Sequence, residues 1–283
     1  MQEGNYFTMK ERILTAKEKK DFQGQIYAHY RLHYRDFPWR RTTNPYNIVV
    51  SEIMLQQTQV ERVHNKYLEF INVFSDFDSL SKAFQKDVLA LWQGLGYNRR
   101  ALALKRLAED VVSKHGGTLP RDVEALSSLP GIGKTTAGAI LAFAFNFPSV
   151  FIETNIRRVF IHEFFDGEDD VKDTEILPLV EATVDRENPR EWYWALMDYG
   201  SMLKKNVENP NRRSAHYTRQ TPFEGSDRRI RGLVLKRLLN DKTLSAEILV
   251  EETGVGLDHL KRILAGLVGE GFIHEDNGLY KIT

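Results

Sequence analysis

The stretch Leu129-Pro-Gly-Ile-Gly-Lys-Thr-Thr-Ala137 could form a phosphate-binding hairpin between two helices. Pro130 ends one helix, Gly131 and Gly133 permit a tight turn, and Thr135 begins the next helix. Backbone N–H groups at a helix start can hold a phosphate oxygen without a charged side chain. The four-residue spacing of a Walker loop is missing, and a Gly-x-Gly turn alone is weak evidence, because a simple interhelical turn also explains it.

A second feature is a local excess of basic residues between positions 204 and 237. This segment holds ten Lys or Arg and three acidic residues, whereas the whole chain balances 39 Lys+Arg against 39 Asp+Glu. Such an excess indicates contact with phosphate groups, although a solvated linker would explain it equally well.

The composition excludes several kinds of site and protein. The 283 residues include no cysteine, which excludes disulfides, thiolate catalysis, and zinc or iron–sulfur sites held by cysteine. No apolar run approaches the roughly 20 residues that a bilayer-spanning helix needs. The first six residues lack the basic-then-apolar pattern of a secretion signal. We therefore expect a cytoplasmic protein, associated with the nucleoid if its source is prokaryotic.

The elements that must position these residues are helical, and the pattern predicts an all-α protein. Apolar residues recur at three- and four-residue spacing over residues 16–34, 49–73, 79–94, 99–115 and 135–145. A polar, turn-rich stretch at 206–225 marks a boundary. We predict a helical domain over 1–205, a basic linker or loop over 206–225, and a second domain over 226–283.

The second domain has its own pattern. Residues 228–239, 245–252 and 257–268 are predicted helices, and 272–283 is a predicted hairpin with Asn277-Gly278 as its two-residue turn. Three helices and a terminal hairpin resemble a winged helix-turn-helix module. Such modules bind DNA or mediate protein contacts, and the adjacent basic segment favours DNA.

Several motifs, in order over roughly residues 25–203, resemble one enzyme family. The hairpin, continued by Thr136-Ala-Gly-Ala-Ile140, resembles that of the helix-hairpin-helix (HhH-GPD) DNA glycosylases of base excision repair. The closest resemblance is to the MutY-type adenine DNA glycosylases, through Ser51-Glu-Ile-Met-Leu-Gln-Gln-Thr-Gln-Val60, Phe37-Pro-Trp-Arg40, Asn44-Pro-Tyr46 and Leu91-Trp-Gln-Gly-Leu-Gly-Tyr97. The resemblance implies a two-lobed helical domain that acts, as a monomer, on double-stranded DNA with a mispaired or damaged base.

The resemblance also implies two carboxylates with separate roles. Glu52 corresponds to the acid that protonates the leaving base, and Glu153 to the carboxylate that stabilises positive charge on the sugar. Asn155 is expected to orient Glu153 or a water. The family normally has Asp, a Gly and then Asn here, whereas this chain has Glu153 and Thr154. The longer side chain shifts the carboxylate by roughly an ångström, which costs rate, or the pocket is rebuilt for another base.

Other positions correspond to residues that contact DNA or the base in the family. Gln56 corresponds to a residue that enters the base stack and is expected on the same helix face as Glu52, four residues earlier. Tyr97 corresponds to a wedge opposite the flipped base, although an aromatic residue there could also pack in the core. Trp39 and Arg40 resemble residues that flank the extruded base. The remaining expected DNA contacts are Gln57, Gly131, Gly133, Lys134, Thr135, Arg212, Arg213 and Arg219.

Lys134 could suggest a Schiff-base lyase. In the bifunctional relatives, however, the nucleophilic lysine lies two residues after the second glycine, where this chain has Thr135. One residue rotates a side chain by about 100° around a helix, so Lys134 would point elsewhere. The resemblance therefore implies a monofunctional glycosylase.

Two departures from the adenine-specific subgroup matter. Its members carry four cysteines for a [4Fe–4S] cluster after a Met-Asp-x-Gly segment, but here Lys204 follows Met197-Asp-Tyr-Gly-Ser-Met-Leu203. We expect no cluster, no other metal and no cofactor, with room for a monovalent cation at the hairpin. The subgroup's β-rich domain that recognises 8-oxoguanine is also replaced by residues 226–283. We expect this module to add DNA affinity and little chemistry.

The leading hypothesis is a monofunctional glycosylase that removes adenine from mispairs. A mismatch thymine/uracil glycosylase, or a glycosylase for another modified base, is the alternative. A third hypothesis is a non-catalytic, winged-helix DNA-binding regulator, and the retention of both carboxylates argues against it.

Overall fold

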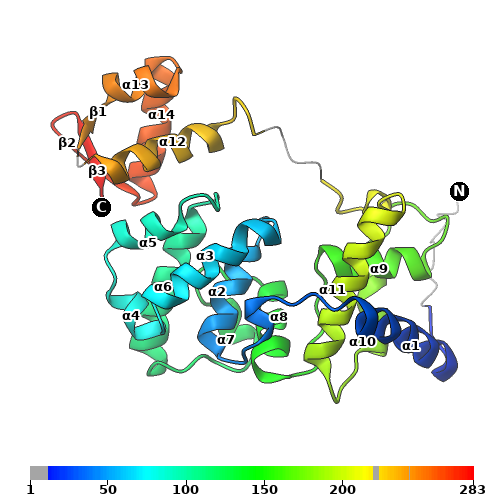
Figure 1. Cartoon of the computed structure of the whole chain (residues 1–283). Helices are drawn as coiled ribbons and strands as arrows, with labels where there is room; N and C mark the ends of the chain where they lie inside the picture. The colour runs from blue at the N-terminus through cyan, green and yellow to red at the C-terminus, as the bar shows by residue number, and fades with distance from the viewer. Residues whose placement is uncertain (1–11, 219–222, 242) are drawn as a thin grey trace, which may run out of the picture. The chain divides into compact units, whose positions relative to one another are not determined.

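The computed structural model describes residues 12–218, 223–241 and 243–283 (Figure 1). Its contacts divide the chain into two units. Unit 1 combines Met1–Asp36 with Ala137–Thr218, and unit 2 combines Phe37–Thr136 with Arg219–Thr283. Each unit is therefore built from segments that are distant in the sequence. The three-part division predicted from composition, with boundaries at 205 and 225, stays a prediction.

Unit 1 is a helical bundle around an aromatic core. Helix α11 packs against α9 and α1. Phe22 of α1 makes edge-to-face contacts with Phe160, Phe164 and Trp192, at centroid distances of 4.9–5.8 Å. The elements of this unit are α1 (Ala16–His33), α8 (Lys134–Phe145, which begins in unit 2), α9 (Thr154–Phe164), α10 (Asp173–Thr183), α11 (Pro189–Asn206) and the 3-10 turn η2 (Pro210–Arg213).

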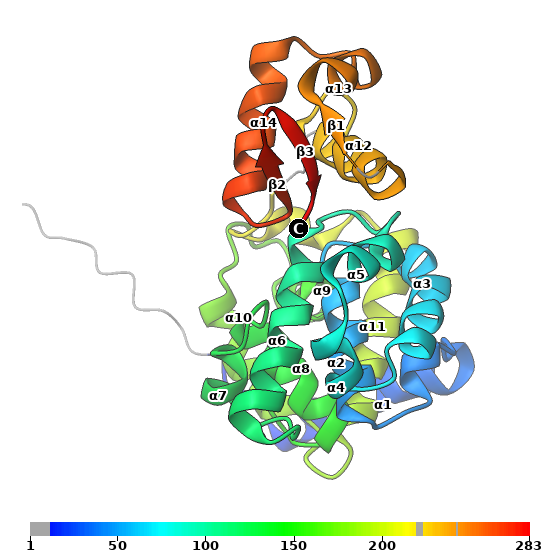
Figure 2. The ribbon, with the colours of Figure 1, turned by 90° about the vertical axis from the view of Figure 1, so that its left-hand side faces the viewer.

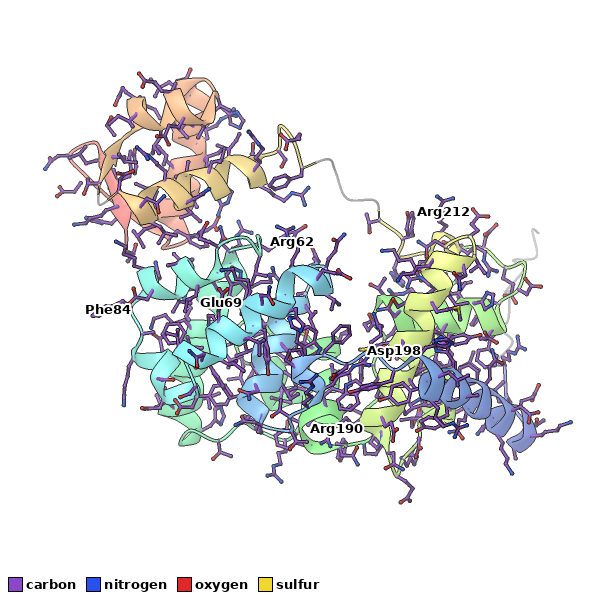
Figure 3. All side chains as sticks on the ribbon, in the orientation of Figure 1. Arg62, Glu69, Phe84, Arg190, Asp198 and Arg212 are labelled. Atoms are coloured by element: carbon purple, nitrogen blue, oxygen red, sulfur yellow. The ribbon has the colours of Figure 1, made fainter. Side chains whose placement is uncertain are left out.

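Two contacts fix α11 within this unit. Asp198 of α11, labelled in Figure 3, is buried and accepts a hydrogen bond from Arg35 Nε at 2.5 Å. Gly200, one half-turn later, lies so close to α9 that an added Cβ would stand 2.5 Å from the backbone oxygen of Asn155. The glycine therefore permits the close approach of the two helices.

Unit 2 contains the remaining helices and a small sheet. Its elements before the C-terminal module are η1 (Pro38–Arg40), α2 (Pro45–Leu55), α3 (Val60–Val73), α4 (Phe77–Lys82), α5 (Gln85–Trp92), α6 (Arg99–His115) and α7 (Val123–Ser127). Helix α6 packs on α4, α5 and α2, and Trp92 is among the largest fully buried side chains of the described residues.

Two of the predicted helices are each divided. The stretch 49–73 is interrupted at residues 56–59, because Gln57 has a φ of +53°, which a right-handed helix does not accommodate. The stretch 79–94 is interrupted at Ala83 and Phe84, where Ala83 is extended. The helices predicted at 16–34, 99–115 and 135–145 are confirmed to within one residue at each end.

The C-terminal module has the predicted three helices and terminal hairpin. Its elements are α12 (Asp227–Asn240), β1 (Leu244–Ser245), α13 (Ala246–Thr253), α14 (Leu257–Gly269), β2 (Ile273–Asp276) and β3 (Leu279–Ile282). Asn277 and Gly278, both at positive φ, form the two-residue turn. The short strand β1 was not predicted; it pairs with β3 and gives the sheet order β1-β3-β2. Figure 2 shows the hairpin beside α14.

Candidate active site and DNA interface

Glu52 lies on α2, the apolar helix of unit 2. Its side chain is half-buried, and its neighbours Ile53 and Met54 are fully buried. The helix begins at Pro45 behind the cap Asn44, whose side-chain oxygen accepts from the Tyr46 N–H at 2.9 Å. The role of Glu52 as the acid stays a prediction.

Glu153 is the N-cap of α9 in unit 1. One carboxylate oxygen accepts from the N–H groups of Asn155 and Ile156, at 2.7 and 2.8 Å. The other oxygen accepts from the side-chain amide of Asn155 at 3.2 Å. Burial raises the pKa of the Glu153 carboxyl above its ordinary value, and the two backbone N–H groups oppose that rise. The carboxylate is thus fixed in orientation at a helix N-terminus, whose N–H groups favour its negative charge in opposition to burial.

A buried arginine stands behind this carboxylate. Arg158 is 3% exposed, and its Nη1 donates to Asn155 Oδ1 at 2.7 Å and to the Gly200 carbonyl at 2.8 Å. Its Nε donates to Asn209 Oδ1 at 3.1 Å. The hydrogen-bonded chain from Asn209 through Arg158 and Asn155 therefore reaches Glu153. Arg158 was not among the residues predicted for the site; the signal for it in the sequence is an arginine one helical turn after Asn155, on a helix with an apolar face.

The segment that follows α11 packs against α9. The Asn211 amide donates to the Thr154 carbonyl at 2.9 Å, and Val171 pairs with Ser214. Arg213 donates to the carbonyl of Phe165 and, at 3.3 Å, to that of Ile161, so it caps the C-terminal end of α9. This structural role accounts for its guanidinium, and the predicted phosphate contact stays a prediction.

The other two arginines predicted in this segment differ in what the structure describes. Arg212, labelled in Figure 3, is exposed and pairs with Glu208 at 3.0 Å. Arg219 lies outside the described residues. In the parts of the chain that the structure describes, three or more His, Asp or Glu side chains nowhere gather in a way that could hold a metal ion. The expected lack of a cluster and the monovalent cation at the hairpin stay predictions.

Trp39 and Arg40, the expected base-pocket residues, are buried in η1. The Trp39 ring stacks on Phe37 with centroids 5.1 Å apart and meets Tyr67 edge-on at 5.5 Å. The Arg40 guanidinium lies 5.3 Å from the centroid of Phe37. The packing fixes both side chains, and contact with a base stays a prediction.

The structure joins Gln56 to the hairpin. Its side-chain amide donates to the Gly131 carbonyl at 3.1 Å and to Thr136 Oγ1 at 3.2 Å. Gln56 is the C-cap of α2, which ends at Leu55, and its expected place on the helix face of Glu52 stays a prediction. The neighbouring Gln57 is exposed.

The hairpin itself has the predicted form. Gly131 has a φ of +81°, and Gly133 is exposed immediately before α8. The helix begins at Lys134, whose side chain is exposed, as is that of Thr135. A Cβ on Gly131 would meet Ala103 Cβ at 2.9 Å, so close packing on α6 also requires this glycine. The arrangement presents backbone N–H groups at a helix start, as a phosphate contact requires.

Arg100 of α6, also not among the predicted site residues, connects the end of α2 to the loop before α6 by hydrogen bonds. It is 9% exposed and donates through Nη1 to the carbonyls of Ile53 and Met54, at 2.9 and 2.8 Å. Its Nη2 donates to Thr58 Oγ1 at 2.9 Å and to the Gly96 carbonyl at 3.1 Å. The guanidinium therefore satisfies the carbonyls left open at the end of α2 and stabilises the chain where the helix ends.

Tyr97 lies in a turn between α5 and α6. Its φ is +46°, and those of Gly94 and Gly96 are +93° and +73°. The ring is half-buried, and the guanidinium of Arg100 lies 5.4 Å from its centroid. Tyr97 thus lies in a turn, and its insertion into DNA stays a prediction.

Comparisons with known proteins give three similarities. The sequence pattern of the HhH-GPD superfamily base excision DNA repair proteins matches residues 50–185. The chain is 38% identical over 173 residues to an adenine DNA glycosylase of Buchnera aphidicola. This alignment covers 60% of this chain and 48% of that protein. The chain is 31% identical over 193 residues to a thymine/uracil-DNA glycosylase of Methanothermobacter thermautotrophicus. This alignment covers 67% of this chain and 87% of that protein. The chain thus spans about half the length of the Buchnera protein.

A solved structure of a thermostable thymine-DNA glycosylase is also similar. It aligns with a TM-score of 0.62 and 28% sequence identity, over 69% of this chain and 91% of that chain. Among the described residues, no helix combines the length and apolar character needed to cross a bilayer.

Proposed function

This chain belongs to the HhH-GPD superfamily of base excision DNA repair proteins, and from that premise we propose that it is a monofunctional DNA glycosylase. It flips a base out of duplex DNA and hydrolyses the N-glycosidic bond of that base. We propose adenine in a mispair as the base. The enzyme acts as a monomer on double-stranded DNA in the cytoplasm, without an iron–sulfur cluster.

The observation that carries this proposal is the fixed carboxylate of Glu153. Three N–H hydrogen bonds hold it at the start of α9, and Arg158 holds Asn155 in turn. A preorganised negative charge stabilises the oxocarbenium character of the sugar when the base departs. Glu52 supplies the proton to the base, which leaves poorly as an anion.

The monofunctional assignment rests on Thr135. A lyase needs a lysine amine that can attack C1′ and form a Schiff base. Here the lysine is Lys134, the first residue of α8, with its side chain in solvent. We assign Lys134 to a phosphate contact beside the hairpin N–H groups. Hydrolysis by water leaves an intact abasic strand.

A second candidate is a mismatch thymine/uracil glycosylase. Two similarities favour it: the relative from Methanothermobacter thermautotrophicus and the solved thymine-DNA glycosylase. Glu153 and Thr154, which replace the Asp and Gly usual in the family, are expected to lie beside the base pocket. Recognition of 8-oxoguanine opposite adenine has no support from the C-terminal module.

A panel of duplex oligonucleotides separates these candidates. Each duplex carries one target base, namely A, T, U or hypoxanthine, opposite G, C or 8-oxoguanine, and strand breakage after hot alkali reports base release. We expect release of adenine from mispairs, with Glu52→Gln as the inactive control. Release of thymine or uracil alone from mispairs with G would establish the second candidate. Binding without release of any base would point to the non-catalytic regulator.

A further inference from the structure

The C-terminal module contacts Tyr97, the residue expected to open the DNA duplex if the chain is a glycosylase. Arg228 of α12 donates through Nη1 to the Tyr97 hydroxyl at 2.8 Å. Its guanidinium also lies 5.8 Å from the centroid of the Tyr97 ring. Arg228 of the C-terminal module therefore contacts Tyr97, which lies in a loop expected to enter DNA.

The Tyr97 loop (residues 94–98) needs external contacts to hold one conformation. Gly94, Gly96 and Tyr97 all have positive φ, and for a tyrosine this region is unfavourable. Arg100 holds one side of the loop through the Gly96 carbonyl and the Tyr97 ring. Arg228 supplies the second guanidinium on that ring and the hydrogen bond to its hydroxyl.

The module is anchored beside this loop by a shared carboxylate. Glu270 accepts two hydrogen bonds from Arg99, both at 2.7 Å, and one from Arg231 at 2.6 Å. Gln85 of α5 donates to the Gly271 carbonyl at 2.8 Å. Arg231 follows Arg228 by three residues, so the two arginines lie on one face of α12. The anchor therefore fixes the position of Arg228 relative to Tyr97.

The exposed charges elsewhere on the module have both signs. The hairpin and α13 present Glu275, Asp276, Glu247, Glu251 and Glu252 to solvent, whereas α14 and β3 present Lys261, Arg262 and Lys281. Charge by itself therefore does not assign the module to phosphate binding. Two of the arginines of α12, Arg228 and Arg231, are instead engaged with Tyr97 and Glu270.

We propose that Arg228 is a positioning residue, through which the C-terminal module holds the Tyr97 ring ready for insertion into DNA. The proposal rests on the proposed function, because it assigns Tyr97 to base extrusion. It extends the expectation drawn from the sequence, in which the module adds DNA affinity and little chemistry. Arg228 acts on the step that opens the duplex, and it leaves the carboxylate chemistry to Glu52 and Glu153.

The test compares Arg228→Met with Arg229→Met. Arg229→Met is the matched control, because it removes one charge from the next position of α12. Arg229 pairs with Glu224 at 3.1 Å instead of contacting Tyr97. Hydrogen exchange of the full-length free protein measures the order of residues 94–98 without DNA or activity. Single-turnover base release and fluorescence of a 2-aminopurine beside the target base measure the chemical outcome and the opening of the duplex.

We expect Arg228→Met to increase exchange in the Tyr97 loop and to lower the 2-aminopurine signal. The single-turnover rate should fall about tenfold, within the range that small misplacements cost. Duplex affinity and melting temperature should match those of Arg229→Met, and Arg228→Lys should recover part of the rate. Adding Tyr97→Phe to Arg228→Met should cause little further loss, because both changes remove the same hydrogen bond.

Unchanged exchange in the Tyr97 loop would overturn the proposal, as would equal rate losses in the two arginine variants. If exchange rises but the wild-type chain releases no base from any duplex, the proposed function fails and the structural role of Arg228 stands. If exchange rises and the active enzyme is not slowed, the positioning role is wrong although the glycosylase assignment holds.

Discussion

Arg158 Nη1 lies 2.7 Å from Asn155 Oδ1, and this hydrogen bond joins a buried guanidinium to the residue that orients Glu153. The same guanidinium reaches Asn209, in the cysteine-free segment after α11. In this chain a polar network therefore lies between that segment and the candidate catalytic carboxylate.

Removing this guanidinium should slow base release more than it weakens DNA binding. In Arg158→Met, the Asn155 and Gly200 oxygens lose their donor, which costs about 1–3 kcal/mol of stability for a buried polar group. We expect the single-turnover rate to fall at least about tenfold, because small misplacements of a reacting group are costly. Arg157→Met on the same helix is the control for loss of charge, because both arginines lower the pKa of Glu153 but Arg157 pairs with Asp173 and not with Asn155. Equal rates in the two variants would contradict the role of Arg158.

Gly200→Ala should destabilise unit 1. Its new Cβ would stand 2.5 Å from the Asn155 backbone oxygen and 2.8 Å from the Asn155 Cβ, so α11 and α9 must move apart. We expect a loss of about 1–3 kcal/mol in the free energy of unfolding, as for other overpacked sites. Gly24→Ala in α1 is the control, because nothing lies within 4 Å of its Cβ and alanine favours a helix. Urea unfolding should show opposite signs for the two substitutions.

Glu52→Gln should abolish base removal and leave duplex binding nearly intact. The amide keeps the shape of the side chain but cannot deliver a proton to the base. The loss should be at least about 10²-fold, the low end for general acid catalysis. Single-turnover kinetics measure it, and substantial residual activity would remove Glu52 from this role.

The product should be an intact abasic strand that breaks only after hot alkali. This follows from Thr135, which stands where a lyase lysine is needed. Borohydride reduction during the reaction should trap no covalent protein–DNA adduct. Efficient trapping would refute the monofunctional assignment and direct attention to Lys134.

The ion pair between Arg157 and Asp173 should make stability depend on acidity. Burial alone would raise the pKa of the Asp173 carboxyl, but the hydrogen bonds and charge of Arg157 outweigh it and hold the pKa below its ordinary value of 3.8. A carboxyl with a lowered folded-state pKa stabilises the protein above the unfolded value, and this contribution is lost as pH falls through the folded value. Asp173→Asn should cost about 1 kcal/mol at neutral pH, where the pair is part-exposed.

Urea unfolding at pH 7 and near pH 3 measures this prediction. The difference between wild type and Asp173→Asn should shrink at the lower pH, since protonation removes the pair in the wild type. An equal difference at both pH values would show that Asp173 stabilises the fold without its charge.

The helices with strong local patterns could be predicted from the sequence. The amphipathic spacing at 99–115 and the Asn277-Gly278 turn depend on neighbouring residues alone, and both have the predicted form. The hairpin at Gly131 and Gly133 was also predictable, because proline and glycine restrict or widen backbone choice locally. These local signals carried the family resemblance and, with it, the candidate carboxylates Glu52 and Glu153.

Only the tertiary structure decided where α2 ends and what holds Tyr97 and Glu153. Arg100 reaches carbonyls 44–47 residues away in the sequence, and Arg228 reaches Tyr97 across 131 residues. Periodicity cannot show such contacts, because they depend on which buried carbonyl or ring the fold brings to a guanidinium. From sequence alone an arginine is expected at the surface. Once the fold buries it, its N–H groups must form hydrogen bonds, and these bonds allow it to position other residues.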